Sequence, residues 1–277
     1  MPELPEVETV ARGLRDSLLG RTITGVTVGW PRTIARLTVA EFTERVAGQR
    51  IALIGRRGKY VIIELSAGYL LIHLKMSGRL CVVPMDEPSD RHVHVLFDLD
   101  DGRQLRFRDV RKFGRIYLVD EPSEITAGLG PEPLADDFTV EDFSRLLARR
   151  RGRLKPLLLN QRFLAGLGNI YADEALFAAR LHPMRKADSL TDDEQARLYG
   201  AIRTVLKQAV VSRGTTLSDG GYTDASGRAG GYQDRIAVYG RGGEPCPRCR
   251  IPIERIVIGG RSAHFCPHCQ VEGRSAC

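Results

Sequence analysis

Two Cys-x-x-Cys pairs near the C-terminus are the feature that most restricts how this chain can fold. The pairs are Cys246/Cys249 and Cys266/Cys269, and 16 residues separate the second cysteine from the third. This gap falls within the ~15–20 residues that are typical of a zinc ribbon. Four thiolates form a closed tetrahedral site whose role is structural rather than catalytic. The spacing therefore predicts one structural Zn²⁺ ion, and redox or disulfide chemistry at these pairs is the weaker interpretation.

The segment between the two pairs has the pattern of a hairpin. Ile251–Ile258 and Ser262–Phe265 are strand-like, and Gly259-Gly-Arg261 joins them as a turn. We therefore expect Arg261 at the tip of a zinc-bound hairpin. Without a further function, Arg261 is an exposed turn arginine.

The composition indicates a globular protein with a polyanionic partner. The chain is 43% hydrophobic and 27% charged, and its length of 277 residues suggests about two domains. A formal net charge of +7 favours a polyanion but does not choose between nucleic acid and an acidic membrane surface. No apolar run approaches the ~20 residues of a membrane span, and the acidic N-terminus lacks the apolar region of a signal peptide. These features predict a cytoplasmic protein.

The N-terminal half has the pattern of a β domain with flanking helices. Apolar residues with helical period predict a helix from Pro5 to Gly20 and a second one at Val39–Val46. The rest reads as short strands with polar turns: Thr22–Val28, Arg50–Gly55, Tyr60–Leu65, Tyr69–Leu74, Arg79–Val83, His92–Phe97, Gln104–Arg108 and Arg115–Val119. Many short strands at regular spacing indicate a sandwich or a barrel.

The C-terminal half has a helical pattern. Thr139 is expected to cap a helix that leads into the arginine-rich stretch Ala148–Arg153. Two glycines and Asn169 precede an apolar pattern, so Asn169 is expected to cap a helix whose first N–H groups can bind an anion. A core helix is expected at Thr191–Val211, and the Gly-rich stretch Ser218–Asp234 has the length of a functional loop.

These patterns predict an α+β protein. Residues 128–138 are rich in Gly, Pro and acidic residues and have the composition of a linker. The expected divisions are an N-terminal β domain at 2–127, this linker, a helical domain at 139–235 and a zinc finger at 236–272.

The first nine residues, Met-Pro-Glu-Leu-Pro-Glu-Val-Glu-Thr, could carry chemistry. Removal of Met1 would leave the nitrogen of Pro2 as a free secondary amine, which can attack an electrophilic sugar carbon and form an iminium. Its pKa of ~7.7–8.0 leaves a useful neutral fraction at physiological pH. Glu3 lies beside that amine and could transfer protons. The simpler interpretation is that Pro5 starts a helix and the glutamates favour its positive end.

Two loops have a composition suited to entering a nucleic acid. Met76 is followed by Ser-Gly, which makes it a candidate for an exposed tip, and Phe113 lies among cations in Arg108–Gly114. Core packing is the ordinary role of both side chains. Enzymes that act on a base must extract it from the stack, however, and apolar side chains can fill the gap.

Taken together, the PELPEVET start, the two loops, the Gly-Asn element and the zinc hairpin resemble the formamidopyrimidine-DNA glycosylases, nearly over the whole chain. The resemblance implies an N-terminal β-sandwich, a helical domain with a helix–two-turns–helix element, and a C-terminal zinc ribbon. It implies a bifunctional DNA glycosylase and AP lyase that removes oxidised purines such as 8-oxoguanine and formamidopyrimidines from duplex DNA. The catalytic residues that it implies are Pro2, Glu3, Lys59 and Arg261.

The resemblance also implies a set of DNA contacts. Met76, Arg111 and Phe113 would fill the space left by the flipped nucleotide. The remaining contacts that it implies are His73, His92, Arg150, Lys155 and Asn169. Damaged duplex DNA would be the partner of a monomer located at the nucleoid, with no membrane partner.

Three alternatives stay open at this stage. The sister endonuclease VIII type prefers oxidised pyrimidines, although that branch usually has Gly where this chain has Leu4. A non-catalytic zinc-ribbon protein that binds DNA would need the basic residues and cysteines but no free Pro2. A zinc-ribbon RNA-binding factor would leave the pairing of Met76 with Phe113 unexplained.

Overall fold

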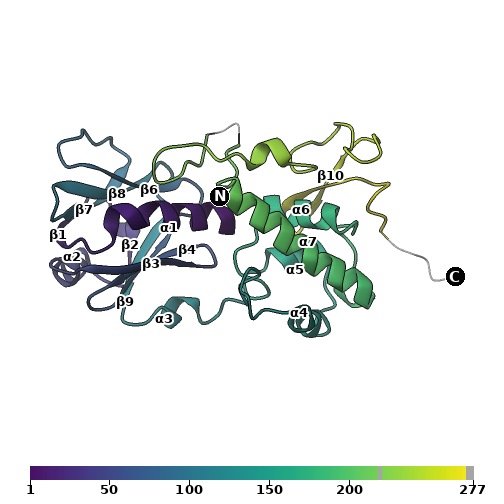
Figure 1. Ribbon diagram of the computed structural model, residues 1–277, viewed down its shortest axis with the longest axis horizontal. Helices are drawn as coiled ribbons and strands as arrows, with labels where there is room; N and C mark the ends of the chain where they lie inside the picture. Colours follow the sequence, from purple (N-terminus) through teal and green to yellow (C-terminus); the bar gives the residue numbers. More distant parts are fainter. Residues whose placement is uncertain (218–219, 273–277) are drawn as a thin grey trace. The chain divides into compact units, whose positions relative to one another are not determined.

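The protein consists of two compact units in a computed structural model that describes residues 1–217 and 220–272 (Figure 1). Unit 1 comprises Met1–Gly128 and Val210–Gln233. Unit 2 comprises Leu129–Ala209 and the described chain from Asp234 onward. Of the Gly-rich stretch at 218–234, residues 218 and 219 lie outside the described residues. No helix of the described chain is long and apolar enough to cross a bilayer.

Unit 1 is a sandwich of two β-sheets, which confirms the predicted fold class. One sheet is antiparallel and has the order β1 (Ile23–Val28), β7 (Val93–Leu99), β8 (Arg103–Asp109), β6 (Gly78–Pro84). The other has the order β2 (Ile34–Ala35), β9 (Arg115–Val119), β5 (Tyr69–His73), β4 (Tyr60–Leu65), β3 (Ile51–Arg57). Only β2 and β9 among these strand pairs run parallel. His92 lies just before β7 rather than inside it, which corrects the predicted strand start.

Helices α1 (Leu4–Leu18) and α2 (Val39–Val46) cover this sandwich, as predicted. The apolar stripe of α1, which includes Val7, Leu14 and Leu18, is fully buried with the inward side chains of both sheets. Burial of each such side chain contributes roughly 1.5–3 kcal/mol. Thr38 caps α2, because its hydroxyl accepts the N–H of Glu41. The short segments η1 (Pro31–Thr33) and α3 (Ser123–Thr126) complete this part of the chain.

Unit 2 is helical and ends in a two-stranded hairpin. Its elements are α4 (Val140–Leu147), α5 (Leu154–Leu159), α6 (Asn169–Ala178), η2 (Ala187–Ser189), β10 (Glu254–Ile258) and β11 (Arg261–Phe265), together with α7 (Asp192–Val211) up to Ala209 and η3 (Tyr232–Arg235) from Asp234. Thr139 caps α4 as predicted, since its hydroxyl accepts the N–H of Asp142 at 3.2 Å.

Two local predictions in unit 2 were wrong. Gly168 is the N-cap of α6, and Asn169 is the first helical residue. Glycine is tolerated at an N-cap because it adopts the extended conformation of this position, although it has no side chain to accept a hydrogen bond. Arg261 is not in the turn but is the first residue of β11, opposite Ile258. Gly259 and Gly260, with φ of 57° and 74°, form the whole turn, which suits the left-handed conformations of a two-residue hairpin.

Candidate functional site

Pro2 and Glu3 are fixed at the N-terminal end of α1. Both residues are buried, and Glu3 is 3% exposed, whereas Met1 is 51% exposed. Glu3 is the N-cap of α1 and forms a reciprocal capping box with Glu6. In it the Glu6 carboxylate accepts the Glu3 N–H at 2.7 Å. The backbone beside the candidate nucleophile is therefore held in one conformation.

Glu6 is a functional candidate that sequence reasoning missed. It is 2% exposed, and its other carboxylate oxygen accepts the N–H of Thr215 at 2.7 Å. Tyr222, whose ring is also buried, donates its hydroxyl to the carbonyls of Arg213 at 3.1 Å and Glu6 at 3.4 Å. These bonds tie the start of α1 to the segment that leads into the Gly-rich stretch. Thr215 lies 209 residues after Glu6 in the chain, so no local sequence pattern could have revealed this hydrogen bond.

Replacing Gly214 with alanine is expected to destabilise unit 1 through this contact. Gly214 has a φ of +77°, and a Cβ built on it would lie 2.7 Å from a carboxylate oxygen of Glu6. Left-handed backbone at a non-glycine residue costs on the order of 1–3 kcal/mol. We expect a loss of that size in the free energy of unfolding, measured in urea. Gly128→Ala is the matched control because nothing lies within 4 Å of its Cβ position, and equal losses in both variants would contradict this account.

The N-terminal end of α1 points toward the hairpin turn that carries Lys59. Arg15 donates to the carbonyl of Ile54 at 3.0 Å, and Glu8, nearer the start of α1, pairs with Arg56 at 3.0 Å. The helix thus runs back along β3 toward the β3–β4 turn. Arg56 also donates to the carbonyl of Gly58 at 3.0 Å, inside that turn.

The pair of Glu8 and Arg56 is well sheltered, with side chains 17% and 9% exposed. Burial acts to raise the pKa of the Glu8 carboxyl, but hydrogen bonds and charge from Arg12 and Arg56 outweigh it and hold that pKa below its ordinary value. The carboxylate is therefore ionised at neutral pH and holds the guanidinium in place.

Strand register gathers the predicted residues of unit 1 at one end of the five-stranded sheet. Lys59, 5% exposed, immediately precedes β4, whose first residue Tyr60 is opposite His73 at the end of β5. His73 is in turn opposite Arg115, the first residue of β9 and the one that follows the Phe113 loop. Lys59, His73 and that loop therefore share one sheet end, toward which α1 directs Pro2.

His73 is a neutral imidazole with a defined tautomer. Burial above all, and then the charges of Lys75 and Lys59, lower its pKa to about 3. Its Nδ1 accepts the backbone N–H of Lys75 at 3.0 Å, so the proton resides on Nε2. His73 can therefore donate one hydrogen bond to an anion without carrying a charge.

A buried carboxylate, Asp109, joins the two loops that carry Met76 and Phe113. Asp109 is 0% exposed. One of its oxygens accepts from the Ser77 hydroxyl at 2.5 Å and the Arg111 N–H at 3.1 Å, and the other accepts from the Gly114 N–H at 2.7 Å. It closes one loop on itself and bonds it to the other. Sequence reasoning missed Asp109, although its place at the end of a strand before a turn was a weak signal.

The tips of the two joined loops expose apolar side chains beside cations. Met76 is 42% exposed and Phe113 is 48% exposed, with the Arg111 guanidinium 4.9 Å from the Phe113 ring centre. Lys75 and Lys112, one in each loop, have left-handed φ angles of 53° and 58°. Strained backbone of this kind costs of order 1–3 kcal/mol and concentrates at functional sites. His92 is half-buried, and its carbonyl accepts the Asp109 N–H at 2.9 Å. His92 therefore lies at the base of the two loops that Asp109 joins.

In unit 2, the start of α6 is held by a buried ion pair. The Lys155 ammonium is fully buried and donates to Asp173 at 2.6 Å and to the carbonyl of Asn169 at 2.9 Å. Asp173 also accepts the backbone N–H of His264, in β11, at 3.0 Å. Lys155 therefore lies inside the unit and positions the first turn of α6, which begins with Asn169.

The Asn169 side chain is oriented toward the zinc hairpin. Its amide nitrogen donates to the Ser262 hydroxyl at 3.2 Å, and its buried oxygen lacks a hydrogen-bond partner among the described residues. The exchanged amide orientation would let the Ser262 hydroxyl donate to the amide oxygen of Asn169. Arg261, next to Ser262, is exposed, as is Arg150 after α4.

The four predicted cysteines form a metal site. Their sulfur atoms all lie within 4.8 Å of one another, with 3.4 Å between Cys249 and Cys266 and 4.0 Å between Cys246 and Cys269. Tetrahedral zinc with Zn–S bonds of ~2.3 Å requires sulfur separations of about 3.8 Å. Burial and then the three neighbouring cysteine sulfurs raise the pKa of Cys269, because a cation is needed to hold four thiolates side by side. The site fits one structural Zn²⁺ ion, as predicted.

Glu174, near these elements, is a structural carboxylate. It is 3% exposed and accepts the backbone N–H groups of Ala237, Val238 and Tyr239 at 2.8–3.0 Å. Those residues lead into the zinc finger. Glu174 thereby fixes the entry of that segment to α6.

The two units define a helix–two-turns–helix protein with a β-sandwich and a zinc finger. Models of the formamidopyrimidine-DNA glycosylase N-terminal domain, of its H2TH domain, and of a zinc finger found in FPG and IleRS match residues 1–116, 129–220 and 243–271. The chain belongs to the formamidopyrimidine-DNA glycosylase family.

Individual relatives agree with this assignment. The formamidopyrimidine-DNA glycosylase of Herpetosiphon aurantiacus is 51% identical over 259 residues, which cover 92% of this chain and 94% of the relative. The crystal structure of the MutM (Fpg) protein from Thermus thermophilus superposes with a TM-score of 0.89 at 46% identity, over 99% and 100% of the two chains. Wild-type Lactococcus lactis Fpg in complex with an N7-benzyl-Fapy-dG containing DNA has a TM-score of 0.90 at 35% identity, over 98% and 100%.

Proposed function

We propose that this protein is a bifunctional DNA glycosylase and AP lyase that removes oxidised purines from duplex DNA in base excision repair. The observation that carries the proposal is the sheet end at which the register places Lys59, His73 and the Phe113 loop, with α1 directing Pro2 toward it. Family membership and the net charge of +7 support a DNA substrate. Lesion extrusion, amine attack and strand cleavage are the steps such a site can perform.

The first chemical step belongs to Pro2. After removal of Met1, its nitrogen attacks C1′ of the damaged nucleotide, the bond from C1′ to the base breaks, and the base leaves with the bonding electrons and takes up the proton that the Pro2 nitrogen loses. Glu3 gives a proton to the ring oxygen of the sugar, which opens the ring and leaves an iminium between Pro2 and C1′. The capping box with Glu6 holds both groups for this exchange.

Strand cleavage follows from the iminium. Loss of a proton from C2′ breaks the C3′–O bond, which is β-elimination, and a second elimination breaks the C5′–O bond. We assign Lys59 to proton transfer in the first elimination. Arg261 contacts the phosphate at the lesion and donates a proton in the second. Zinc supplies no chemistry, because Cys246, Cys249, Cys266 and Cys269 leave it no open position.

DNA contacts come from both units. In unit 1, Met76, Arg111 and Phe113 occupy the place of the extruded nucleotide, and His73 and His92 contact phosphates. In unit 2, Arg150 and Asn169 contact the backbone, and we propose that Lys155 acts through Asn169, whose carbonyl it binds. We further propose that the protein acts as a monomer in the cytoplasm, at the nucleoid.

A cleavage assay on defined lesions tests the activity. Duplexes with 8-oxoguanine opposite cytosine, with an oxidised pyrimidine, and with no lesion are incubated with the zinc-loaded protein and resolved on a denaturing gel. We expect cleavage of the first duplex to leave phosphate at both edges of a one-nucleotide gap. Faster cleavage at the oxidised pyrimidine would assign the endonuclease VIII type of activity instead. Binding without cleavage of any lesion, including an abasic site, would leave a DNA-binding module.

Replacing Asp109 with asparagine is expected to impair base removal more than strand cleavage. An amide nitrogen cannot accept a hydrogen bond, so either Gly114 or the Ser77 and Arg111 donors lose their acceptor, at a cost of about 1–3 kcal/mol. Since unstacking a base itself costs a few kcal/mol, we expect excision of 8-oxoguanine to slow about tenfold or more. Cleavage at a preformed abasic site, which has no base to extrude, should change less.

Asp86→Asn is the matched control for this variant, because Asp86 is an exposed residue outside the two joined loops. Single-turnover rates on both substrates, measured for both variants, separate the two steps. Equal slowing of excision and of abasic-site cleavage by Asp109→Asn would argue that this carboxylate supports the whole fold of unit 1 rather than the loops.

A further inference from the structure

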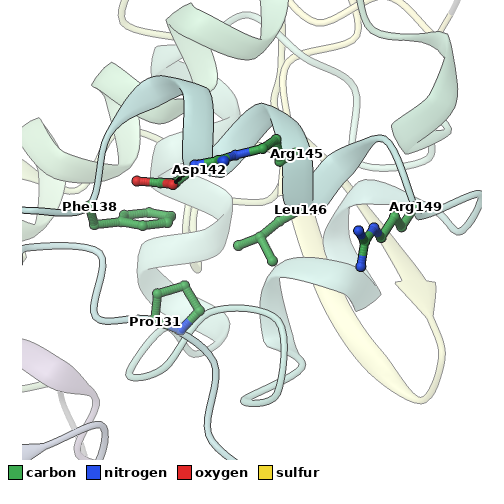
Figure 2. A pocket seen from close by; sticks show the side chains of 6 residues that line it. All are labelled: Pro131, Phe138, Asp142, Arg145, Leu146 and Arg149. Carbon is green, nitrogen blue, oxygen red and sulfur yellow. Dashed lines mark hydrogen bonds and ion pairs between the residues drawn. The ribbon is translucent and has the colours of Figure 1, made fainter.

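Unit 2 contains a pocket beside α4 that the proposed repair chemistry does not use. The cavity has a volume of about 340 Å³ and is lined by Pro131, Phe138, Asp142, Arg145, Leu146 and Arg149 (Figure 2). Its size is at the lower end of the range of ligand pockets, ~300–1,000 Å³. Pro131 and Phe138 come from the segment before α4, and Leu146 from α4 itself, so an apolar floor lies between two arginines and an aspartate.

The walls of this pocket are fixed without a ligand. The ring of Phe138 lies 5.9 Å from that of Tyr199, whose hydroxyl donates to the Phe138 carbonyl at 2.6 Å. Arg203 donates to the carbonyls of Pro133 and Ala135 at 2.8 Å each. These contacts from α7 hold the segment that forms one wall. A preformed pocket loses little conformational freedom on binding, which favours a real ligand site over a transient gap.

The rim of the pocket is positively charged. Arg145 is 76% exposed and pairs with Asp142. Hydrogen bonds from Thr139, followed by that of Arg145, hold the pKa of Asp142 below its ordinary value, so the aspartate is already engaged in capping α4 and pairing. Arg149 is exposed and has no ion pair among the residues that the structure describes. The Arg149 guanidinium is therefore available to a ligand. The Arg145 guanidinium could also bind a ligand carboxylate while it pairs with Asp142.

We propose that this pocket binds an acidic segment of a partner protein. An apolar side chain of the segment would enter between Phe138 and Leu146. The carboxylates of the segment would pair with Arg149 and Arg145, because arginine and carboxylate groups form strong bidentate hydrogen bonds. A DNA phosphate could pair with these arginines but would leave the apolar floor uncovered. A second copy of this chain fits poorly because its net charge is +7. Charge complementarity and an apolar anchor together favour an acidic peptide.

Fluorescence anisotropy with a synthetic peptide tests the proposal. The probe is a fluorescein-labelled peptide with four acidic residues followed by two leucines, and its control has glycines in place of the leucines. The full-length, zinc-loaded protein is titrated at low salt. We expect a Kd on the order of 10–100 µM for the probe and binding weaker by about tenfold or more for the control peptide.

Variants locate the binding. Arg149→Glu and Leu146→Ser are each expected to weaken binding about tenfold, whereas Lys207→Glu, the same charge reversal on exposed α7 surface, should leave it within about twofold. If Leu146→Ser does not fold, as judged by circular dichroism, the paired peptides and Arg149→Glu still decide the matter. Equal affinity for both peptides would show that binding depends on charge alone and not on the apolar floor, which would overturn the proposal.

Two further outcomes would also overturn it. One is the absence of any binding of the probe below 1 mM. The other is displacement of the probe by undamaged duplex DNA combined with equal loss of DNA affinity in Arg149→Glu, which would assign the rim to the DNA interface. Retained DNA affinity in Arg149→Glu, together with lost peptide affinity, supports a separate partner surface.

Discussion

Sodium borohydride is expected to fix this protein covalently to 8-oxoguanine duplex DNA through Pro2, and a form that retains Met1 should trap at least about 1,000-fold more slowly. With Met1 present, the Pro2 nitrogen is an amide and cannot attack the sugar. The amine of Met1 is no substitute, because one residue displaces it by up to ~3.6 Å. A misplacement of ~1 Å already costs about 100-fold in a positioned reaction.

The surroundings of Pro2 make this displacement severe. Pro2 and Glu3 are buried, and the capping box fixes the backbone at the start of α1. Met1, in contrast, is 51% exposed. The amine is therefore placed by the helix start and not by a flexible tail, so its position cannot adjust to an extra residue.

Peptide mapping gives the control. Trypsin cleaves after Arg12, so a reduced adduct on Pro2 appears in the peptide 2–12. The Met1-retaining form should bind a duplex with a stable abasic-site analogue as tightly as the processed form, which separates chemistry from binding. An adduct on Lys59 or on another lysine, with equal yield in both forms, would refute the assignment of Pro2.

The sequence predicted the parts of the site whose signals are local. The cysteine spacing and the strands β4 and β9 each depend on residues close in the chain, and these predictions were confirmed, while α1 begins at Leu4, one residue before the predicted Pro5.

The missed residues are buried polar groups with distant partners. Glu6 binds Thr215 across 209 positions, and Asp109 binds Ser77 across 32. In the sequence, Glu6 looks like one more acid favouring a helix start, and Asp109 like one more polar residue in a turn. A buried carboxylate needs several donors to offset its desolvation. All of those donors except the Ser77 hydroxyl are backbone N–H groups, which no residue pattern identifies.

Both missed carboxylates hold two segments of the chain together. Glu6 joins the helix that carries Pro2 to the segment after Arg213, and Asp109 joins the loops that carry Met76 and Phe113. Each is a single buried group that makes two chain segments move as one. The residues proposed to meet the substrate are thus positioned by buried carboxylates.

Removal of one zinc ligand is expected to abolish tight DNA binding, with a loss of about 100-fold or more in affinity. Cys266 is fully buried and directly follows the strand β11, which begins with Arg261. In Cys266→Ala, the three remaining thiols bind zinc poorly, and a structural zinc site contributes ~10–16 kcal/mol to the order of its finger. The hairpin β10–β11 should then lose its fixed pairing.

The damage should extend beyond the hairpin because β11 supports the start of α6. Ser262 accepts the Asn169 amide at 3.2 Å, and His264 donates to Asp173, the partner of Lys155. Release of β11 removes Arg261 and loosens Asn169 at once, so the two phosphate contacts proposed for these residues fail together. Each charge-assisted contact contributes ~1.5–3 kcal/mol, which accounts for the expected fold-change.

Zinc content, DNA anisotropy and hydrogen exchange over residues 254–265 measure this result together. Cys81→Ser is the matched control, since Cys81 lies in β6 outside the metal cluster and should leave zinc and affinity unchanged. The β-sandwich of unit 1 has its own core, so its exchange protection should survive in Cys266→Ala. Native affinity in a zinc-free Cys266→Ala protein would show that the finger is dispensable for holding Arg261 and Asn169.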